Sequence, residues 1–298
     1  MPDLITHISF NYIIYKIVKK RLSLFLILFG AILPDLFSAM AILLSDLFKL
    51  YDRIEQIIAY MVPSHSIFIA GLLSVAIGIV IKPCRMSIPS LFSGYLLHLF
   101  LDLLQDNYGG GILLFYPFFF RTYSLKLFTY GVGFKYIYTI IPIAIFSLFI
   151  FREKGKETIL FNPKFTRITL SLLLLISAVG INIIFFNKTV KSNTYFINFR
   201  FDPAKYHNTQ ITINKHRPIK TDPVMIRFRR HLLTLKNVKI KVYKDKWYYI
   251  KGIYDHRERS LHVIKMIDRP PYMKAIISGV GLLMFMFFLI FKIKIRKE

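Results

Sequence analysis

Cysteine and acidic residues are scarce in this sequence. Cys84 is the single cysteine among 298 residues, which excludes an intramolecular disulfide and a zinc site built from thiolates. Asp and Glu number 16 against 41 Lys and Arg, which gives a formal net charge of +25. A metal site in this chain therefore has to use His and a few carboxylates, and the positive charge predicts contact with anionic surfaces.

Long apolar runs make up much of the chain. Hydrophobic residues account for 55% of it and aromatic residues for 16%, with a mean hydropathy of +0.49, so we expect much of the chain to lie in lipid. Membrane helices need roughly 17 to 25 residues. Runs of about this length cover residues 22–44, 66–82, 88–104, 136–152, 168–186 and 273–291, and the segment 4–18 is a shorter candidate helix. These runs predict a mainly α fold, a polytopic helical membrane bundle of about six or seven helices with a small strand-rich extramembrane domain.

The first of these runs contains Pro34 and Asp35. A carboxylate inside a membrane segment is usually functional, and we expect the helix to end at about residue 34. Lys and Arg gather in alternate short loops, which the positive-inside rule places in the cytoplasm. The helix ends between those loops, which carry His65 and Asp102, are then expected at the outer face of a multi-pass protein.

Residues 187–272 show a different pattern. Apolar and polar residues alternate there, as in the segment 238–242, and a period of two predicts β-strands. Turn-like segments separate three such stretches, so we expect an antiparallel meander over 238–243, 247–254 and 261–267.

The chain therefore divides into three parts. Residues 1–186 are expected to form a helical membrane domain that carries the functional site, and residues 187–272 a basic strand-rich extramembrane domain. Residues 273–298 are expected to form a C-terminal membrane helix with a basic tail. The charge of 187–272 predicts anionic lipid headgroups as a partner of that domain, whereas its alternation does not suit a nucleic-acid-reading element.

Five side chains of metal-ligand type are expected at the outer face. His98 and Asp102 stand four residues apart, so they project from one side of a helix near its outer end. His65 begins the preceding apolar run at the same face. If the first two apolar segments form a hairpin with a cytoplasmic turn, His7 and Asp35 also reach that face.

Three imidazoles and two carboxylates form a ligand set that suits Zn²⁺, with Mn²⁺ or Fe²⁺ as alternatives, whereas Mg²⁺ and Ca²⁺ prefer more oxygen ligands. The candidate metal ligands are His7, Asp35, His65, His98 and Asp102. Of these, Asp35, His65 and Asp102 are also the candidates for catalytic roles, in which a carboxylate acts as general base or orients an imidazole. The alternative reading treats each His as an amphipathic residue at the membrane interface.

Residues 5–120 resemble a known family. The segments Thr6-His7, Leu33-Pro34-Asp35, Ser64-His65-Ser66 and His98-Leu99-Phe100-Leu101-Asp102 are followed by glycines at 109 to 111 and by Pro117. This order and spacing resemble the bacterial inner-membrane metal-dependent hydrolases of the YdjM and YbcI type, also described as LexA-binding. The resemblance implies a bacterial inner membrane and metal-dependent hydrolysis.

The chain departs from the pattern of that family at two places. Phe37 stands where the family has a second Asp, and Tyr60, Met61 and Val62 stand where it has His-Arg. Two ligands of the family pattern are thus missing, and the departure favours one metal ion over two.

Two main hypotheses follow. In the first, the chain is a membrane-bound metal-dependent hydrolase that cleaves an ester or phosphoester, lipids included, at the outer face. The aromatic stretch 115–120 and Arg121 then form an apolar lip for lipid tails with a cation for a phosphate, although such a stretch is also typical of an interfacial aromatic belt. In the second, the chain is a non-catalytic envelope protein that anchors a basic domain for anionic lipid or another partner. The sequence leaves the oligomeric state open.

Overall fold

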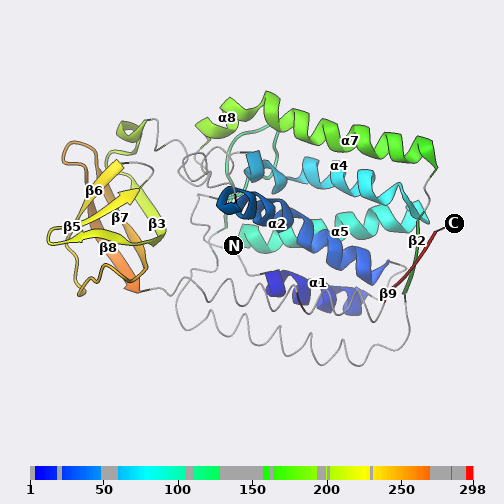
Figure 1. Ribbon diagram of the computed structural model, residues 1–298, viewed down its shortest axis with the longest axis horizontal. Helices are drawn as coiled ribbons and strands as arrows, with labels where there is room; N and C mark the ends of the chain where they lie inside the picture. The colour runs from blue at the N-terminus through cyan, green and yellow to red at the C-terminus, as the bar shows by residue number, and fades with distance from the viewer. Residues whose placement is uncertain are drawn as a thin grey trace.

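The computed structural model describes residues 4–18, 22–47, 60–104, 111–125, 127, 157–161, 164–192, 199, 202–228, 231–268, 283 and 293–297, and structural statements refer to these. Their α-helices are α1 (Leu4–Val18), α2 (Leu24–Leu47), α4 (Ile67–Gly78), α5 (Cys84–Leu104), α7 (Phe165–Ile184) and α8 (Phe186–Lys191). Figure 1 shows α2, α4, α5 and α7 side by side as one helical unit, with the larger group of strands beyond one end of it.

Two glycines bring the backbones of α2 and α5 into contact. A Cβ atom on Gly94 would lie 2.0 Å from the carbonyl oxygen of Ile27, and one on Gly30 would lie 2.2 Å from that of Leu91. Only glycine fits at either position because the obstructing atoms belong to the backbone. The helix α1 packs against α2 through a separate apolar cluster formed by Ile8, Tyr12, Leu24, Leu28 and Ile32.

The other side of α5 is covered by α4, which α7 in turn covers (Figure 1). Ser66 caps the N-terminus of α4 because its hydroxyl oxygen accepts a hydrogen bond from the Ile69 amide at 3.3 Å. The segment 111–125 crosses the ends of these helices, where the hydroxyl of Tyr116 donates to the carbonyl oxygen of Ile181 on α7 at 3.0 Å. The helices therefore meet at this end through loop residues as well as through their own packing.

The strands form two sheets. β1 (Ile81–Lys82), β2 (Glu157–Phe161) and β9 (Ile293–Lys297) form a three-stranded sheet, with β1 antiparallel and β9 parallel to β2. A six-stranded sheet has the order β3-β7-β8-β6-β5-β4. Its strands are β3 (Gln210–His216), β4 (Pro218–Thr221), β5 (Val224–Phe228), β6 (His231–Lys236), β7 (Tyr248–Asp255) and β8 (Ser260–Asp268). All its neighbouring strands are antiparallel except β6 and β8, which pair in parallel.

One face of the six-stranded sheet carries its own apolar core. Alternate residues of β7 are buried, including Tyr248, Ile250 and Tyr254, as expected when one face of a strand is packed. Phe199 is fully buried against this face, and its ring lies 4.8 Å from that of Tyr254. The sheet therefore has a core separate from that of the helices.

The expectation of a mainly α, polytopic bundle of six or seven membrane helices is wrong. Among the described residues, two helices are long and apolar enough to cross a membrane, Cys84–Leu104 and Phe165–Ile184. The strand region is a six-stranded sheet rather than a small meander. The physical reason is that hydropathy does not distinguish apolar residues that face lipid from those that pack in protein, and Leu26, Leu28 and Ala31 of α2 are buried in protein.

Several expected boundaries also differ. The helix expected to end near residue 34 continues through Pro34 to Leu47, and the run 66–82 contains the twelve-residue α4 followed by the short strand β1. Residues 238–243 are not a strand, because β6 ends at Lys236 and Asn237 has a positive φ of 60°. The strands expected at 247–254 and 261–267 are confirmed as β7 and β8, and 4–18 as the helix α1. The apolar run 136–152 lies outside the described residues, and so does the run 273–291 apart from residue 283.

Candidate metal centre

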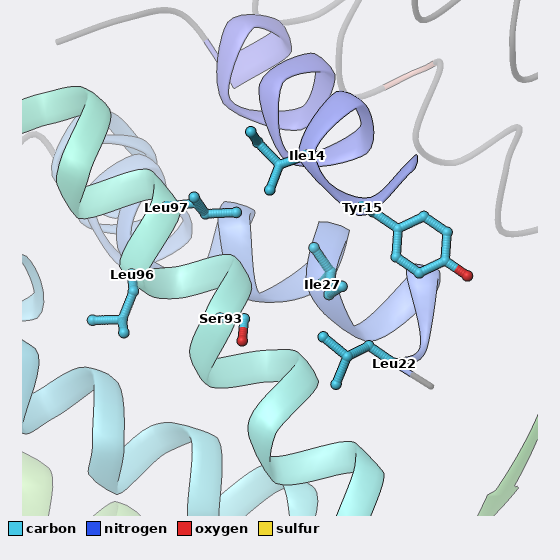
Figure 2. A pocket seen from close by; sticks show the side chains of 7 residues that line it. All are labelled: Ile14, Tyr15, Leu22, Ile27, Ser93, Leu96 and Leu97. Carbon is cyan, nitrogen blue, oxygen red and sulfur yellow. The ribbon is translucent and has the colours of Figure 1, made fainter. Parts of the chain in front are cut away.

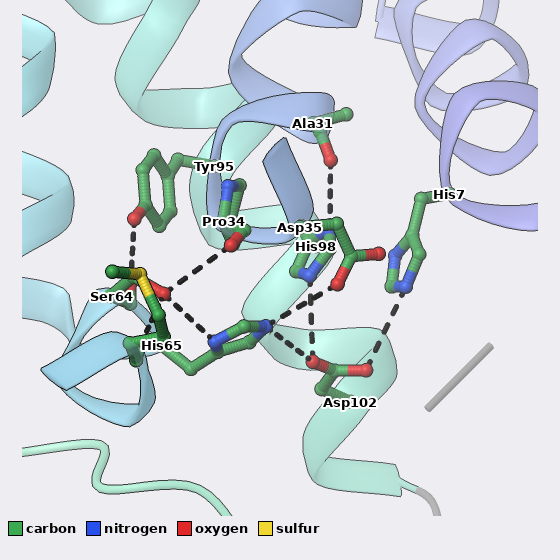
Figure 3. Close-up of polar contacts among 10 residues, drawn as sticks. His7, Ala31, Pro34, Asp35, Ser64, His65, Tyr95, His98 and Asp102 are labelled. Carbon is green, nitrogen blue, oxygen red and sulfur yellow. Dashed lines mark hydrogen bonds and ion pairs between the residues drawn. The ribbon is translucent and has the colours of Figure 1, made fainter. Parts of the chain in front are cut away.

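The structure brings together all five candidate ligands, from three helices and one loop (Figure 3). His7 comes from α1, Asp35 from α2, His65 from the turn before α4, and His98 and Asp102 from the last turns of α5. His65 Nε2 and His98 Nε2 each lie 3.4 Å from Asp102 Oδ2, and His7 Nε2 lies 3.7 Å from Asp102 Oδ1. Asp35 Oδ1 lies 3.7 Å from His65 Nε2. Their roles as metal ligands stay a prediction.

The ring orientation of His98 is fixed by α2. Its Nδ1 lies 2.7 Å from the carbonyl oxygen of Ala31, which only accepts hydrogen bonds, so Nδ1 carries the proton. In the neutral ring, Nε2 is then the unprotonated nitrogen, and it faces Asp102. The close contact of α2 with α5 thus places a backbone acceptor behind a candidate ligand.

The ring of His65 is oriented by its neighbour Ser64. The hydroxyl of Ser64 donates to the carbonyl oxygen of Met61 at 2.7 Å, and its oxygen lies 3.1 Å from His65 Nδ1. Because the hydroxyl proton is engaged, we infer that His65 Nδ1 donates to Ser64, which in the neutral ring leaves Nε2 as the unprotonated nitrogen. The hydroxyl of Tyr95 donates to the backbone carbonyl of Ser64 at 2.5 Å and ties this turn to α5.

His7 is stacked on His98. The two ring centroids lie 3.7 Å apart with an interplanar angle of 13°, and both side chains are fully buried. The backbone carbonyl of His7 accepts a hydrogen bond from the Asn11 side chain at 2.9 Å. The stacking brings both Nε2 atoms to the same carboxylate, Asp102.

The ring nitrogens of this cluster fit a cation. Within the described part of the chain, the Nε2 atoms of His7, His65 and His98 are buried and have no hydrogen-bond partner. A buried polar atom without a partner costs free energy, and such atoms in a native fold suggest an ion that completes the site. Two triads of this cluster have their donor atoms within 4.8 Å of one another, and both contain His98: His7, Asp35 and His98, and His65, His98 and Asp102.

Sequence reasoning missed the groups that hold the ligands. Ser64 and Tyr95 were not expected to orient the turn of His65, and a backbone carbonyl such as that of Ala31 leaves no trace in sequence. The one available signal was the pair of serines on either side of His65, because serine favours capping and turn positions. Both serines are used, Ser64 for the ring of His65 and Ser66 for the cap of α4.

An apolar cavity of about 290 Å³ lies between α1, α2 and α5, and none of the five cluster residues is among those that line it. Figure 2 shows side chains of these three helices around it, with the hydroxyls of Tyr15 and Ser93 as polar groups. Leu97, which lines the cavity, directly precedes His98 in α5. The remaining lining residues are Ile14, Leu22, Ile27 and Leu96.

The model of one family, described as YdjM inner membrane protein, matches residues 1–189 of the chain. The matched region contains all five residues of the cluster and ends before the six-stranded sheet. No curated protein and no solved structure matches the chain.

Proposed function

The chain belongs to the YdjM inner membrane protein family, and from this premise we propose that it is a hydrolase that uses one divalent metal ion to cleave an ester or phosphoester bond of a lipid. The observation that carries the proposal is a set of three buried imidazole Nε2 atoms that face Asp102. None of these three nitrogens has a hydrogen-bond partner among the described residues. Such a donor set suits Zn²⁺ best, with Mn²⁺ or Fe²⁺ as alternatives.

We assign the roles of metal ligand and general base from the positions of the side chains. His98 belongs to both triads and is the ligand that we expect to be indispensable. A bound zinc ion would supply Lewis acidity and lower the pKa of a water molecule. Asp102 is fully buried, whereas the side chain of Asp35 keeps 23% of its surface exposed. Asp35 is therefore the carboxylate that incoming water meets, and we assign it the role of general base, with its carboxylate oxygen holding the proton.

The surroundings support a lipid substrate. Phe118 and Phe119 are 71% and 63% exposed, and the ring of Phe118 lies 5.6 Å from that of Phe68, three residues after His65. The ring of Phe118 thus contacts α4, which follows the turn of His65, and the apolar cavity is lined by Leu97, which precedes His98 in α5. An apolar rim around a few polar groups is typical of small-molecule sites, and here it matches acyl chains.

A metal-dependent hydrolysis assay tests the proposal. The detergent-purified full-length chain is stripped with a chelator and then supplied with Zn²⁺, Mn²⁺, Fe²⁺ or Mg²⁺. Substrates are a chromogenic acyl ester, a chromogenic phosphodiester and a short-chain phospholipid. We expect hydrolysis with Zn²⁺, Mn²⁺ or Fe²⁺ and none with Mg²⁺, because a site rich in imidazole does not suit Mg²⁺.

The variant Asp35→Asn separates catalysis from metal binding, because it keeps the shape of the side chain but removes the base. It should retain metal, because the triad of His65, His98 and Asp102 does not use Asp35, and it should lose most hydrolysis, since general-base catalysis contributes roughly 10²- to 10⁴-fold. Metal binding without hydrolysis of any substrate would remove the hydrolase proposal and leave the metal centre. A chain that binds no metal would overturn both.

Replacing Ser64 tests the orienting contact separately. Ser64→Ala removes the acceptor for His65 Nδ1, so the ring is free to rotate and to change tautomer. Groups that only orient a ligand typically contribute about 10- to 100-fold to metal affinity, and we expect a loss in that range. Metal titration of the stripped protein measures it.

Ser74→Ala is the control for Ser64→Ala. Ser74 is a fully buried serine of α4 whose hydroxyl has no hydrogen-bond partner among the described residues. Its removal should leave metal affinity unchanged and should not lower stability, because no hydrogen bond is lost. Equal losses in the two variants would mean that Ser64 acts on packing and not on His65.

A further inference from the structure

The six-stranded sheet has an outer face opposite its apolar core. Successive side chains of a strand point to opposite faces, so the buried positions Tyr248, Ile250 and Tyr254 of β7 leave Tyr249, Lys251 and Ile253 on the other face. On β8, the residues opposite Tyr249 and Lys251 are Ile267 and Lys265. The register of the two strands shifts between Lys251 and Gly252, so Ile264 is an extra residue of β8 without a partner on β7, and its side chain is exposed. We call the patch of Tyr249, Lys251, Ile253, Ile264, Lys265 and Ile267 the outer patch.

The outer patch combines exposed apolar side chains with paired positive charge. Ile253 is 42% exposed and Ile264 is 58% exposed. Lys251 and Lys265 are direct partners across β7 and β8. Like charges directly opposite one another in a sheet are destabilising, so this pair costs stability unless an anion compensates it.

The nearby acidic residues do not compensate these lysines. Glu258 forms an ion pair with Lys236, whose hydrogen bond and charge keep the pKa of the Glu258 carboxyl below its usual value. Asp268 pairs with Lys246 at 2.7 Å. Asp255 accepts hydrogen bonds from backbone amides of the turn, the nearer at 2.9 Å. Within the described residues, neither Lys251 nor Lys265 has an ion pair, although β7, β8 and their turn contain three acids.

The position of the sheet in the chain keeps it close to a membrane. The strands follow α7 and α8, and α7 is one of the two candidate membrane helices. Most of its apolar side chains are exposed, among them Ile176 at 66% and Ile184 at 75%. A tether of this kind raises the effective concentration of the sheet at the bilayer surface, so a weak contact suffices for docking.

We propose that the outer patch docks on the surface of an anionic lipid bilayer, with Lys251 and Lys265 at headgroup phosphates and Ile253 and Ile264 in the interfacial layer. The charge complementarity and the exposed isoleucines carry this inference. The patch lies outside the region that matches the family, and the proposal is independent of the metal centre. Each lysine near an anionic surface contributes about 1 kcal/mol, so the pair strengthens docking about 30-fold.

A tryptophan placed in the patch tests the docking in the full-length chain. Trp247 is the single tryptophan, so the double variant Trp247→Phe, Ile264→Trp carries its only indole in the outer patch. The protein is reconstituted in vesicles of phosphatidylglycerol or phosphatidylcholine with brominated acyl chains near the interface. We expect quenched, blue-shifted emission in the anionic vesicles and weak quenching in the neutral ones. Salt at 0.5 M should relieve the quenching, because salt screens exposed charges. The Debye length falls from about 10 Å at 0.1 M ionic strength to about 3 Å at 1 M.

Two charge variants complete the test. Lys251→Gln with Lys265→Gln should weaken docking about 30-fold, and it should not lower thermal stability, because it removes a repulsion. Lys239→Gln with Lys244→Gln removes the same charge from the exposed connection between β6 and β7 and should retain the quenching. Absent quenching in anionic vesicles, equal quenching in both lipids, or equal loss in both charge variants would each overturn the proposal.

Discussion

Replacing His98 with alanine is expected to abolish stoichiometric metal binding, and replacing Asp102 is expected to lower metal affinity by orders of magnitude. Both residues lie within one triad whose donor atoms are at most 4.8 Å apart, and His98 also belongs to the other. Removal of a direct ligand costs well over the roughly 10- to 100-fold typical of groups that only orient one. Elemental analysis of detergent-purified protein measures the loss.

Thermal melting gives a second measurement of the same effect. A metal that binds only the folded chain stabilises it by mass action, so added Zn²⁺ should raise the melting temperature of the wild type and of neither variant. His231→Ala and Asp245→Ala are controls of the same residue types in the strand region, and they should retain the response to metal. A wild-type chain that contains no metal and does not respond to Zn²⁺ or Mn²⁺ would contradict the metal centre.

Gly94→Ala is expected to cause a large loss of stability. The new Cβ would meet the carbonyl oxygen of Ile27 at 2.0 Å, and a backbone oxygen cannot give way unless α2 and α5 move apart. Insertion into a packed interface costs about 1 to 3 kcal/mol and occasionally more. The same movement withdraws the carbonyl of Ala31 from His98, so metal affinity should fall together with the melting temperature.

Gly180→Ala is the control for this substitution. Gly180 lies in α7, and apart from the neighbouring backbone of that helix no atom of the described residues lies within 4 Å of its added Cβ. Alanine is about 1 kcal/mol more favourable than glycine in a helix interior, so stability should stay unchanged or rise. If Gly94→Ala is tolerated equally well, the backbone contact between α2 and α5 does not exist in the folded protein.

The five residues of the cluster could be selected from sequence because ionisable side chains in apolar segments are expensive and therefore few. His98 and Asp102 needed only the helical repeat to be placed together, and His65 needed only the end of an apolar run. The charges of the short loops placed these helix ends at one membrane face. A hairpin of the first two apolar segments then placed His7 and Asp35 at that face. The structure puts the five side chains in contact, although their chemistry stays a prediction.

The fold was harder to predict because apolar character alone does not set the length of an element. Pro34 indicated a helix end, yet α2 continues through it to Leu47. The stretch 66–82 is apolar throughout, but the chain leaves the helix after Gly78 and pairs Ile81 with β2, a strand more than 70 residues later. Residues 238–243 alternate as a strand does, although the left-handed backbone of Asn237 ends the strand before them. These outcomes depend on distant partners that a local pattern does not contain.

The parallel pairing of β6 with β8 has a consequence for the order of assembly. β7 and β8 are joined by a short turn and can pair from that turn outward as a local hairpin. β6 precedes β7 in the chain and pairs with the other edge of β8. The strand domain therefore cannot fold by successive addition of neighbouring hairpins. The hairpin of β7 and β8 is expected to form early, and β6, already joined to β5, to dock on it later and more slowly, because that pairing must close a longer loop of chain.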